Sequence, residues 1–180
     1  PHGPVVNDVF VGMNSSTPIS ISWVYTKVEN KTFEAFREMN LAKDMNEFEA
    51  ALPQIHGPGL NINYADAEGN IAWWACAHLP KRNASVNSWI ILNARDTTNE
   101  WKGYYSFKEN PRTINPSWGY IYSANDWPGA LADGTYYPGY YKPQYRADRI
   151  RTLLEASNEW TAEKMKAVLN DVTSTVDASL

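Results

Sequence analysis

Hydrophobic residues recur at helical spacing in four stretches of the chain. The first two stretches follow Thr32 and Asp44, residues that can cap a helix, and Glu47 lies three positions after Asp44, as in a capping box. The side chains expected to face inward in these two helices are Phe33, Phe36, Met39, Met45, Phe48 and Leu52. Two more helices are predicted, one over residues 144–156 and one capped by Thr161, the latter with an inward face formed by Met165, Val168, Leu169 and Val172.

Other stretches favour extended structure. Residues 5–11 and 19–25 predict one hairpin around a turn-rich Asn-Ser-Ser-Thr-Pro segment. Residues 60–65 and 71–77 predict a second, in which Gly69 can adopt the positive φ of a short loop. Residues 80–118 are irregular, with one strand expected at 89–92, and residues 120–123 return to strand character. The pattern as a whole indicates an α+β protein with antiparallel hairpins and flanking helices.

Composition narrows the possible functions. The 180 residues suit one domain, and a net charge of -4 without a basic cluster argues against a nucleic-acid partner. Cys76 is the only cysteine, so an internal disulfide and a multi-cysteine metal site are excluded. No apolar run approaches the roughly 18 residues that a membrane span needs.

Two kinds of polar side chain are candidates for chemistry. On the helix over 144–156, a rotation of about 100° per residue places Arg146 and Arg149 on the side of Ile150 and Leu153, where guanidinium groups need acceptors. The alternative is that both extend to solvent or form structural ion pairs. Asn125 offers an uncharged amide donor at the end of a predicted strand, the type of group that stabilises an oxyanion, although Asn is also common in turns.

Other candidates have simpler explanations. His2, His56 and His78 lack the spacing of a helical zinc site, so no metal site is predicted. Cys76 lies in an apolar strand and is interpreted as a small buried hydrophobe. The aromatic run 136–141 either packs on a neighbouring surface or forms a platform for a sugar.

Three segments, taken in order, resemble the β chain of the penicillin acylase (penicillin amidase) family of N-terminal-nucleophile hydrolases. The first is Asn-Ile-Asn-Tyr-Ala-Asp-Ala-Glu-Gly-Asn-Ile at 61–71, followed by Pro-Lys-Arg at 80–82. The second contains Trp-Lys-Gly at 101–103, Asn-Pro-Ser-Trp-Gly-Tyr-Ile at 115–121 and Asn-Asp-Trp-Pro at 125–128. The third is Tyr-Arg-Ala-Asp-Arg-Ile at 145–150. The resemblance covers roughly residues 30–155.

This resemblance implies an amidohydrolase of which residues 1–180 are one internal fragment of the β chain, contributing part of an αββα sandwich. It assigns catalytic roles to Asn125, as an oxyanion-hole donor, and to Arg149, as the active-site arginine, with Leu60 and Phe36 near the acyl side of the substrate. The attacking residue would be the first residue of the mature β chain, upstream of Pro1, so the fragment is expected to be inactive alone. No cofactor is assigned. Some relatives bind calcium, but the loop between Arg82 and Trp101 lacks the proline-bearing pattern expected for that site, and Asp133 is only an approximate match to an acidic ligand.

The expected partners are an acyl amide substrate and the rest of the parent α and β chains, in a periplasmic or extracellular enzyme. Strand edges left open in a fragment can also pair with a second copy. Two other functions remain open. One is a noncatalytic module that binds glycan or peptide through its Trp and Tyr surfaces, and the other is a tautomerase that uses Pro1 as a base.

Overall fold

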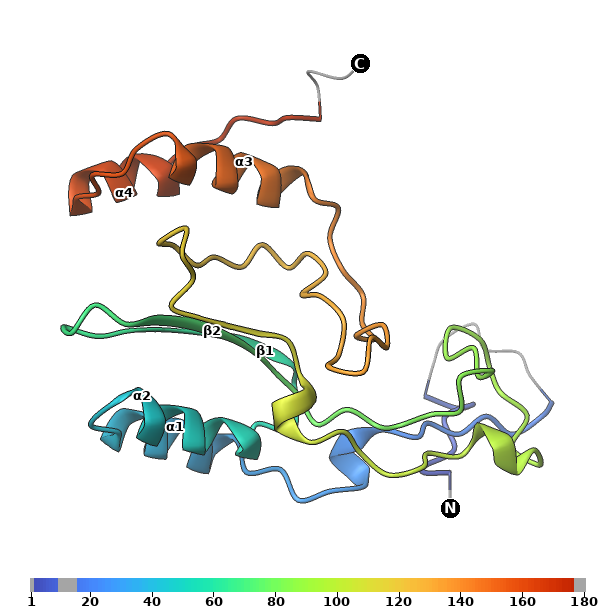
Figure 1. The fold of residues 1–180 in the computed structure, drawn as a ribbon. Helices are drawn as coiled ribbons and strands as arrows, with labels where there is room; N and C mark the ends of the chain where they lie inside the picture. The colour runs from blue at the N-terminus through green and yellow to red at the C-terminus, as the bar shows by residue number, and fades with distance from the viewer. Residues whose placement is uncertain (1, 10–15, 177–180) are drawn as a thin grey trace. The chain divides into compact units, whose positions relative to one another are not determined.

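The computed structural model describes residues 2–9 and 16–176. The chain divides into two compact units, one containing residues 1–60 and 76–110 and the other residues 61–75 and 111–180. Each unit combines irregular segments with a few regular elements, and the strands are antiparallel (Figure 1). The expectation of a mixed helix and antiparallel-sheet protein is confirmed.

The first unit contains two short helices, α1 (Thr32–Leu41) and α2 (Met45–Ala51), and α2 continues into a 3₁₀ turn at Leu52–Gln54. The Asp44 carboxylate accepts a 2.9 Å hydrogen bond from the Glu47 N–H, so the predicted cap of α2 is confirmed. The predicted cap of α1 is wrong, because Thr32 is the first helical residue. The Asn30 side chain instead accepts bonds from the Thr32 N–H at 3.2 Å and from its hydroxyl at 2.7 Å.

The inward face of α1 also differs from the prediction. Thr32 and Ala35 are buried, whereas Phe33 is 87% exposed. Phe33 follows Thr32 by one residue, about 100° around the helix, so the two cannot share a face. Of the other residues expected inside, Leu52 is fully buried and the rest are half-buried.

The N-terminal hairpin is shorter than predicted. A single antiparallel bridge joins Val5 to Ser20, flanked by a 2.9 Å bond from the Val6 N–H to the Ile19 carbonyl. Residues 7–9 form a turn and Val24–Thr26 a 3₁₀ turn, so neither predicted strand runs its full length. The end of the first predicted strand, residues 10–11, lies outside the described residues.

The predicted second hairpin is confirmed as β1 (Leu60–Ala65) and β2 (Ile71–Cys76). Its loop has Gly69 at a φ of 91°, and the Asp66 carboxylate accepts bonds from backbone N–H groups within the loop. A third strand, β3 (Arg112–Ile114), pairs antiparallel with β2 to give the order β1-β2-β3. Trp73 lies opposite Thr113 in this register.

Two predicted strands are not formed. Trp89, Ile90 and Ile91 are 61 to 72% exposed in an irregular loop, where the Asn87 side chain accepts from the Trp89 N–H and closes a turn. The strand of this region is β3, which the hydrophobic pattern does not reveal. Residues 120–123 form no strand, because they pair with no other strand in the described part of the chain and a ladder requires such a neighbour.

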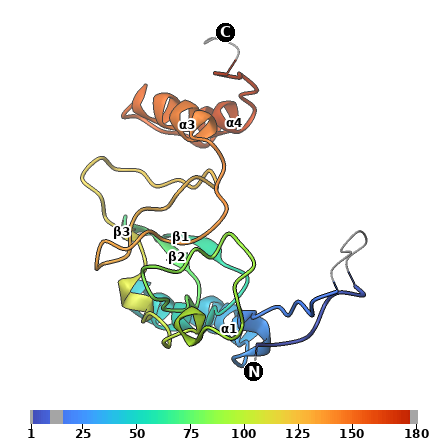
Figure 2. The ribbon, with the colours of Figure 1, turned by 90° about the vertical axis from the view of Figure 1, so that its right-hand side faces the viewer.

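The last two helices, α3 (Tyr145–Glu155) and α4 (Ala162–Leu169), lie side by side (Figures 1 and 2). Thr161 caps α4 as predicted, since its hydroxyl accepts from the Lys164 N–H at 3.3 Å. Of the four residues expected on its inward face, Val168 is half-buried and lines a cavity together with residues of α3, but the other three are exposed. Met165, Leu169 and Val172 are 39, 82 and 96% exposed, because no element of the described chain covers that side.

Candidate functional site

Asn125 lies at the end of the irregular segment that starts at Tyr120. Its φ of 57° lies in the left-handed region, which Asn tolerates better than most residues. The Asn125 carbonyl accepts a 2.8 Å bond from the Lys142 N–H, and the Tyr120 hydroxyl donates to the Glu155 carboxylate of α3 at 2.8 Å. Both ends of the segment that presents Asn125 are therefore tied to residues at or near α3.

The side chain of Asn125 meets an arginine of α3. The Arg146 guanidinium donates to the Asn125 Oδ1 at 2.6 Å and also to the Ala124 carbonyl. Since the oxygen of the carboxamide is taken by a cation, the amide nitrogen points elsewhere and keeps both of its N–H donors available. Within the described residues, the Asn125 Nδ2 makes no hydrogen bond. The exposed amide is thus oriented as a donor.

Arg149, one turn further along α3, has a different partner. Its Nε and one terminal nitrogen donate to the two Asp171 carboxylate oxygens at 3.0 and 2.7 Å, a bidentate pair. This bonding raises the pKa of Arg149 and lowers the pKa of Asp171. Arg146 and Arg149 line one cavity of about 220 Å³, so Arg149 lies near the arginine that bonds Asn125, but the hydrogen bonds of its own side chain go to Asp171 and Thr173. Its catalytic role stays a prediction.

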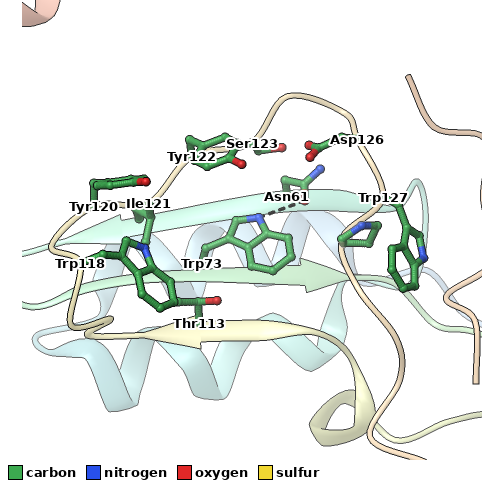
Figure 3. Close-up of a pocket in the computed structure, with 11 residues that line it drawn as sticks. Asn61, Trp73, Thr113, Trp118, Tyr120, Ile121, Tyr122, Ser123, Asp126 and Trp127 are labelled. Atoms are coloured by element: carbon green, nitrogen blue, oxygen red, sulfur yellow. Dashed lines mark hydrogen bonds between the residues drawn. The ribbon is translucent and has the colours of Figure 1, made fainter. Parts of the chain in front are cut away.

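A second cavity is lined by residues on either side of Asn125 in the sequence, Ser123 two positions before it and Asp126 and Trp127 directly after it. It measures about 180 Å³ and lies between the sheet residues Asn61, Trp73 and Thr113 and the segment 118–128 (Figure 3). The Trp73 Nε1–H donates to the Asn61 Oδ1 at 3.0 Å, which fixes the indole on the cavity floor. The ring of Trp127 stacks on Tyr136, with centroids 5.4 Å apart and planes 6° apart.

Leu60 and Phe36, the residues expected near the acyl group, are both half-buried. They belong to the unit of residues 1–60 and 76–110, whereas Asn125 belongs to the other unit. Neither residue lines the two cavities described above. Their substrate-binding role stays a prediction.

Cys76 and the histidines His56 and His78 are the other groups that were candidates for chemistry. Cys76 is fully buried, and desolvation raises its pKa to about 12. The rings of His56 and His78, far apart in sequence, lie 4.7 Å apart, and burial followed by repulsion from His56 lowers the pKa of His78. Within residues 2–9 and 16–176, no three His, Cys, Asp or Glu side chains are grouped so as to hold a metal ion. No helix in that part of the chain has the length and apolarity to cross a membrane.

The fold and the site define a mixed helix and antiparallel-sheet protein that presents a side-chain amide oriented by a guanidinium. A sequence model of the penicillin amidase family matches residues 1–180. The chain belongs to the penicillin amidase family.

Individual relatives agree with this assignment. The chain is 28% identical to penicillin acylase 2 proenzyme of Pseudomonas sp. strain SE83, over 96% of this chain and 22% of that protein. It is 27% identical to the acyl-homoserine lactone acylase QuiP of Pseudomonas aeruginosa, over 99% of this chain and 22% of that protein. The solved structure of a thermostable penicillin G acylase from Alcaligenes faecalis superposes with a TM-score of 0.68 and 25% identity, over 83% of this chain and 26% of that chain. The chain therefore spans about a quarter or less of the length of these relatives.

Proposed function

We propose that this chain is part of an amide hydrolase in which the Asn125 carboxamide donates to the oxyanion formed at the scissile carbonyl. The observation that carries the proposal is the 2.6 Å bond from Arg146 to the Asn125 Oδ1, which directs the amide nitrogen outward as a donor. A neutral donor held in place before the reaction stabilises charge as it develops without being consumed. Relatives named as penicillin and acyl-homoserine lactone acylases support the same reaction class.

The attacking group in this proposal is an N-terminal nucleophile contributed by another part of the parent enzyme. Its own α-amino group would serve as the general base. The present chain, an internal fragment of the β chain, would supply the oxyanion donor and the groups that position it. On this account the fragment alone does not hydrolyse amides.

Exposed apolar surface supports the fragment proposal. Met165 and Leu169 of α4 and Val172 after it are 39, 82 and 96% exposed, and Trp89, Ile90 and Ile91 are 61 to 72% exposed. Patches of this kind mark surfaces that another partner covers. We propose that the parent chains cover them, completing an αββα sandwich to which the helices and strands described here contribute.

The proposed substrates are acyl amides, in an enzyme that acts in the periplasm or outside the cell. In the isolated chain the same apolar surface and the edges of the sheet would favour self-association, and light scattering over a range of concentrations tests this.

The stacked Trp127 and Tyr136 rings, 40 and 53% exposed, favour a second candidate function, the binding of a sugar ring. Titration with oligosaccharides, followed by tryptophan fluorescence, separates this noncatalytic function from hydrolysis.

The test of the main proposal uses the complete processed enzyme. Asn125→Ala removes the donor, and loss of one oxyanion donor lowers kcat by about 10²- to 10³-fold. Asn63→Ala, at an exposed position of β1, is the matched control and should leave kcat unchanged. An Asn125→Ala enzyme with the kcat of the unmodified enzyme would rule the proposal out.

A further inference from the structure

The cavity beside Asn125 combines aromatic walls with one carboxylate. Five of its lining residues carry aromatic rings: Trp73, Trp118, Tyr120, Tyr122 and Trp127. Figure 3 shows Trp73 rising from β2 toward the segment 118–128, with Asp126 near Asn61 at the upper side of the cavity. Asp126 is half-buried and lines this cavity.

The negative charge of Asp126 has no counter-charge in the described part of the chain. Within residues 2–9 and 16–176, its carboxylate takes part in no hydrogen bond and no ion pair. Arg151, whose charge acts on the nearby Tyr122 hydroxyl, is ion-paired with Asp148. A carboxylate with no paired cation, at the wall of a cavity, attracts a cationic ligand group by direct Coulomb interaction.

The rings favour the same kind of ligand. The face of an aromatic ring carries partial negative charge, so indole and phenol rings attract cations. A cavity lined by several such rings therefore favours an alkylammonium group over an anion. The cavity of about 180 Å³ holds one such group and not a whole substrate, since complete ligand sites measure about 300 to 1,000 Å³.

We propose that this cavity is a subsite for an alkylammonium group, held by Asp126 and the surrounding rings. Asp126 directly follows Asn125, and consecutive Cα atoms are about 3.8 Å apart. This inference rests on the proposed function, in which Asn125 binds the oxyanion. It defines the substrate class as an amide that carries a positive charge on the part next to the scissile carbonyl.

Binding tests the subsite without depending on catalysis. Choline and its neutral analogue 3,3-dimethylbutan-1-ol (dimethylbutanol) have the same shape. They differ in charge, because dimethylbutanol carries a tert-butyl group where choline carries a trimethylammonium group. Calorimetric titration of the complete processed enzyme should show choline binding about tenfold more tightly than dimethylbutanol. Asp126→Asn should abolish this preference, whereas Asp8→Asn, which removes the same charge from an exposed position in the other unit, should preserve it.

Equal affinity for the two ligands would overturn the proposal, as would a choline preference that persists in Asp126→Asn. Should Asp126→Asn fail to fold, the comparison of choline with dimethylbutanol in the unmodified enzyme still decides. Kinetics separate this inference from the proposed function. Amide turnover that depends on Asn125, in an enzyme with no preference for choline, refutes the subsite alone. A preference for choline in an enzyme whose turnover ignores Asn125→Ala refutes the proposed function alone.

Discussion

Replacing Arg146 by Met tests whether this arginine acts through Asn125. The substitution keeps the aliphatic stem on α3 and removes the bonds to the Asn125 Oδ1 and the Ala124 carbonyl. A hydrogen bond to a charged group contributes about 1.5 to 3 kcal/mol, and Arg146 is exposed, so the lower end applies. Loss of the whole oxyanion donor costs about 2.7 to 4 kcal/mol. Since Asn125 remains but loses its fixed orientation, kcat of the complete enzyme should fall about ten- to a hundredfold.

A double-mutant cycle provides the decisive assay. If Arg146 only orients Asn125, the enzyme that carries both Arg146→Met and Asn125→Ala should be no slower than Asn125→Ala alone. Arg149→Met is the comparison variant, because the Arg149 guanidinium is bonded to Asp171 and not to the Asn125 side chain. Effects of Arg146→Met and Asn125→Ala that multiply would refute the positioning role. A coupling of Asn125 to Arg149 but not to Arg146 would restore the role that the family resemblance gives Arg149.

Three further predictions concern stability and reactivity. Trp74→Ala, at a position only 1% exposed, should lower the free energy of unfolding by about 3 to 5 kcal/mol in denaturant titrations, while Trp89→Ala, 69% exposed, should change it little. Cys76, whose pKa is raised to about 12 by burial, should resist iodoacetamide in the native protein at neutral pH and react in denaturant; rapid native alkylation would contradict this. Asp171→Asn should lower the melting temperature at neutral pH. The difference should vanish in acid, because a carboxylate whose pKa is depressed stabilises the fold above its ordinary pKa of about 4 and loses this effect as pH falls through the lowered value. A difference that persists in strong acid would exclude the ion pair as its source.

The sequence was sufficient to predict an element wherever the contacts that determine it join residues close together in the chain. The cap of α2 depends on Asp44 and Glu47, and the β1-β2 loop depends on Gly69 with Asp66, so both were predictable. Contacts between segments far apart in the sequence were not predictable. β3 exists because Arg112–Ile114 lies beside β2, and the apolar run at 89–91, which looked more like a strand, has no such neighbour.

In the candidate site, too, some features could be predicted from the sequence and others depend on contacts between distant segments. Asn125 could be selected from its chemistry and from the family resemblance, and helix periodicity placed Arg146 and Arg149 on one side of α3. Periodicity could not decide which arginine reaches Asn125, because that depends on the path of residues 120–125 over α3. In the sequence, Asp126 is part of a turn motif and gives no sign of a binding site. It lies near aromatic rings only because Trp73 and the segment 118–128 come together in space.

The most direct test of the central claim is a crystal structure of the complete processed enzyme with a bound transition-state analogue, such as an acyl-chain boronate. The account predicts that the Asn125 Nδ2 lies about 2.7 to 3.1 Å from the analogue's oxygen that mimics the oxyanion, with the Asn125 Oδ1 still bonded to Arg146. An oxyanion bound by other donors, with the Asn125 amide turned away from it, would contradict the account.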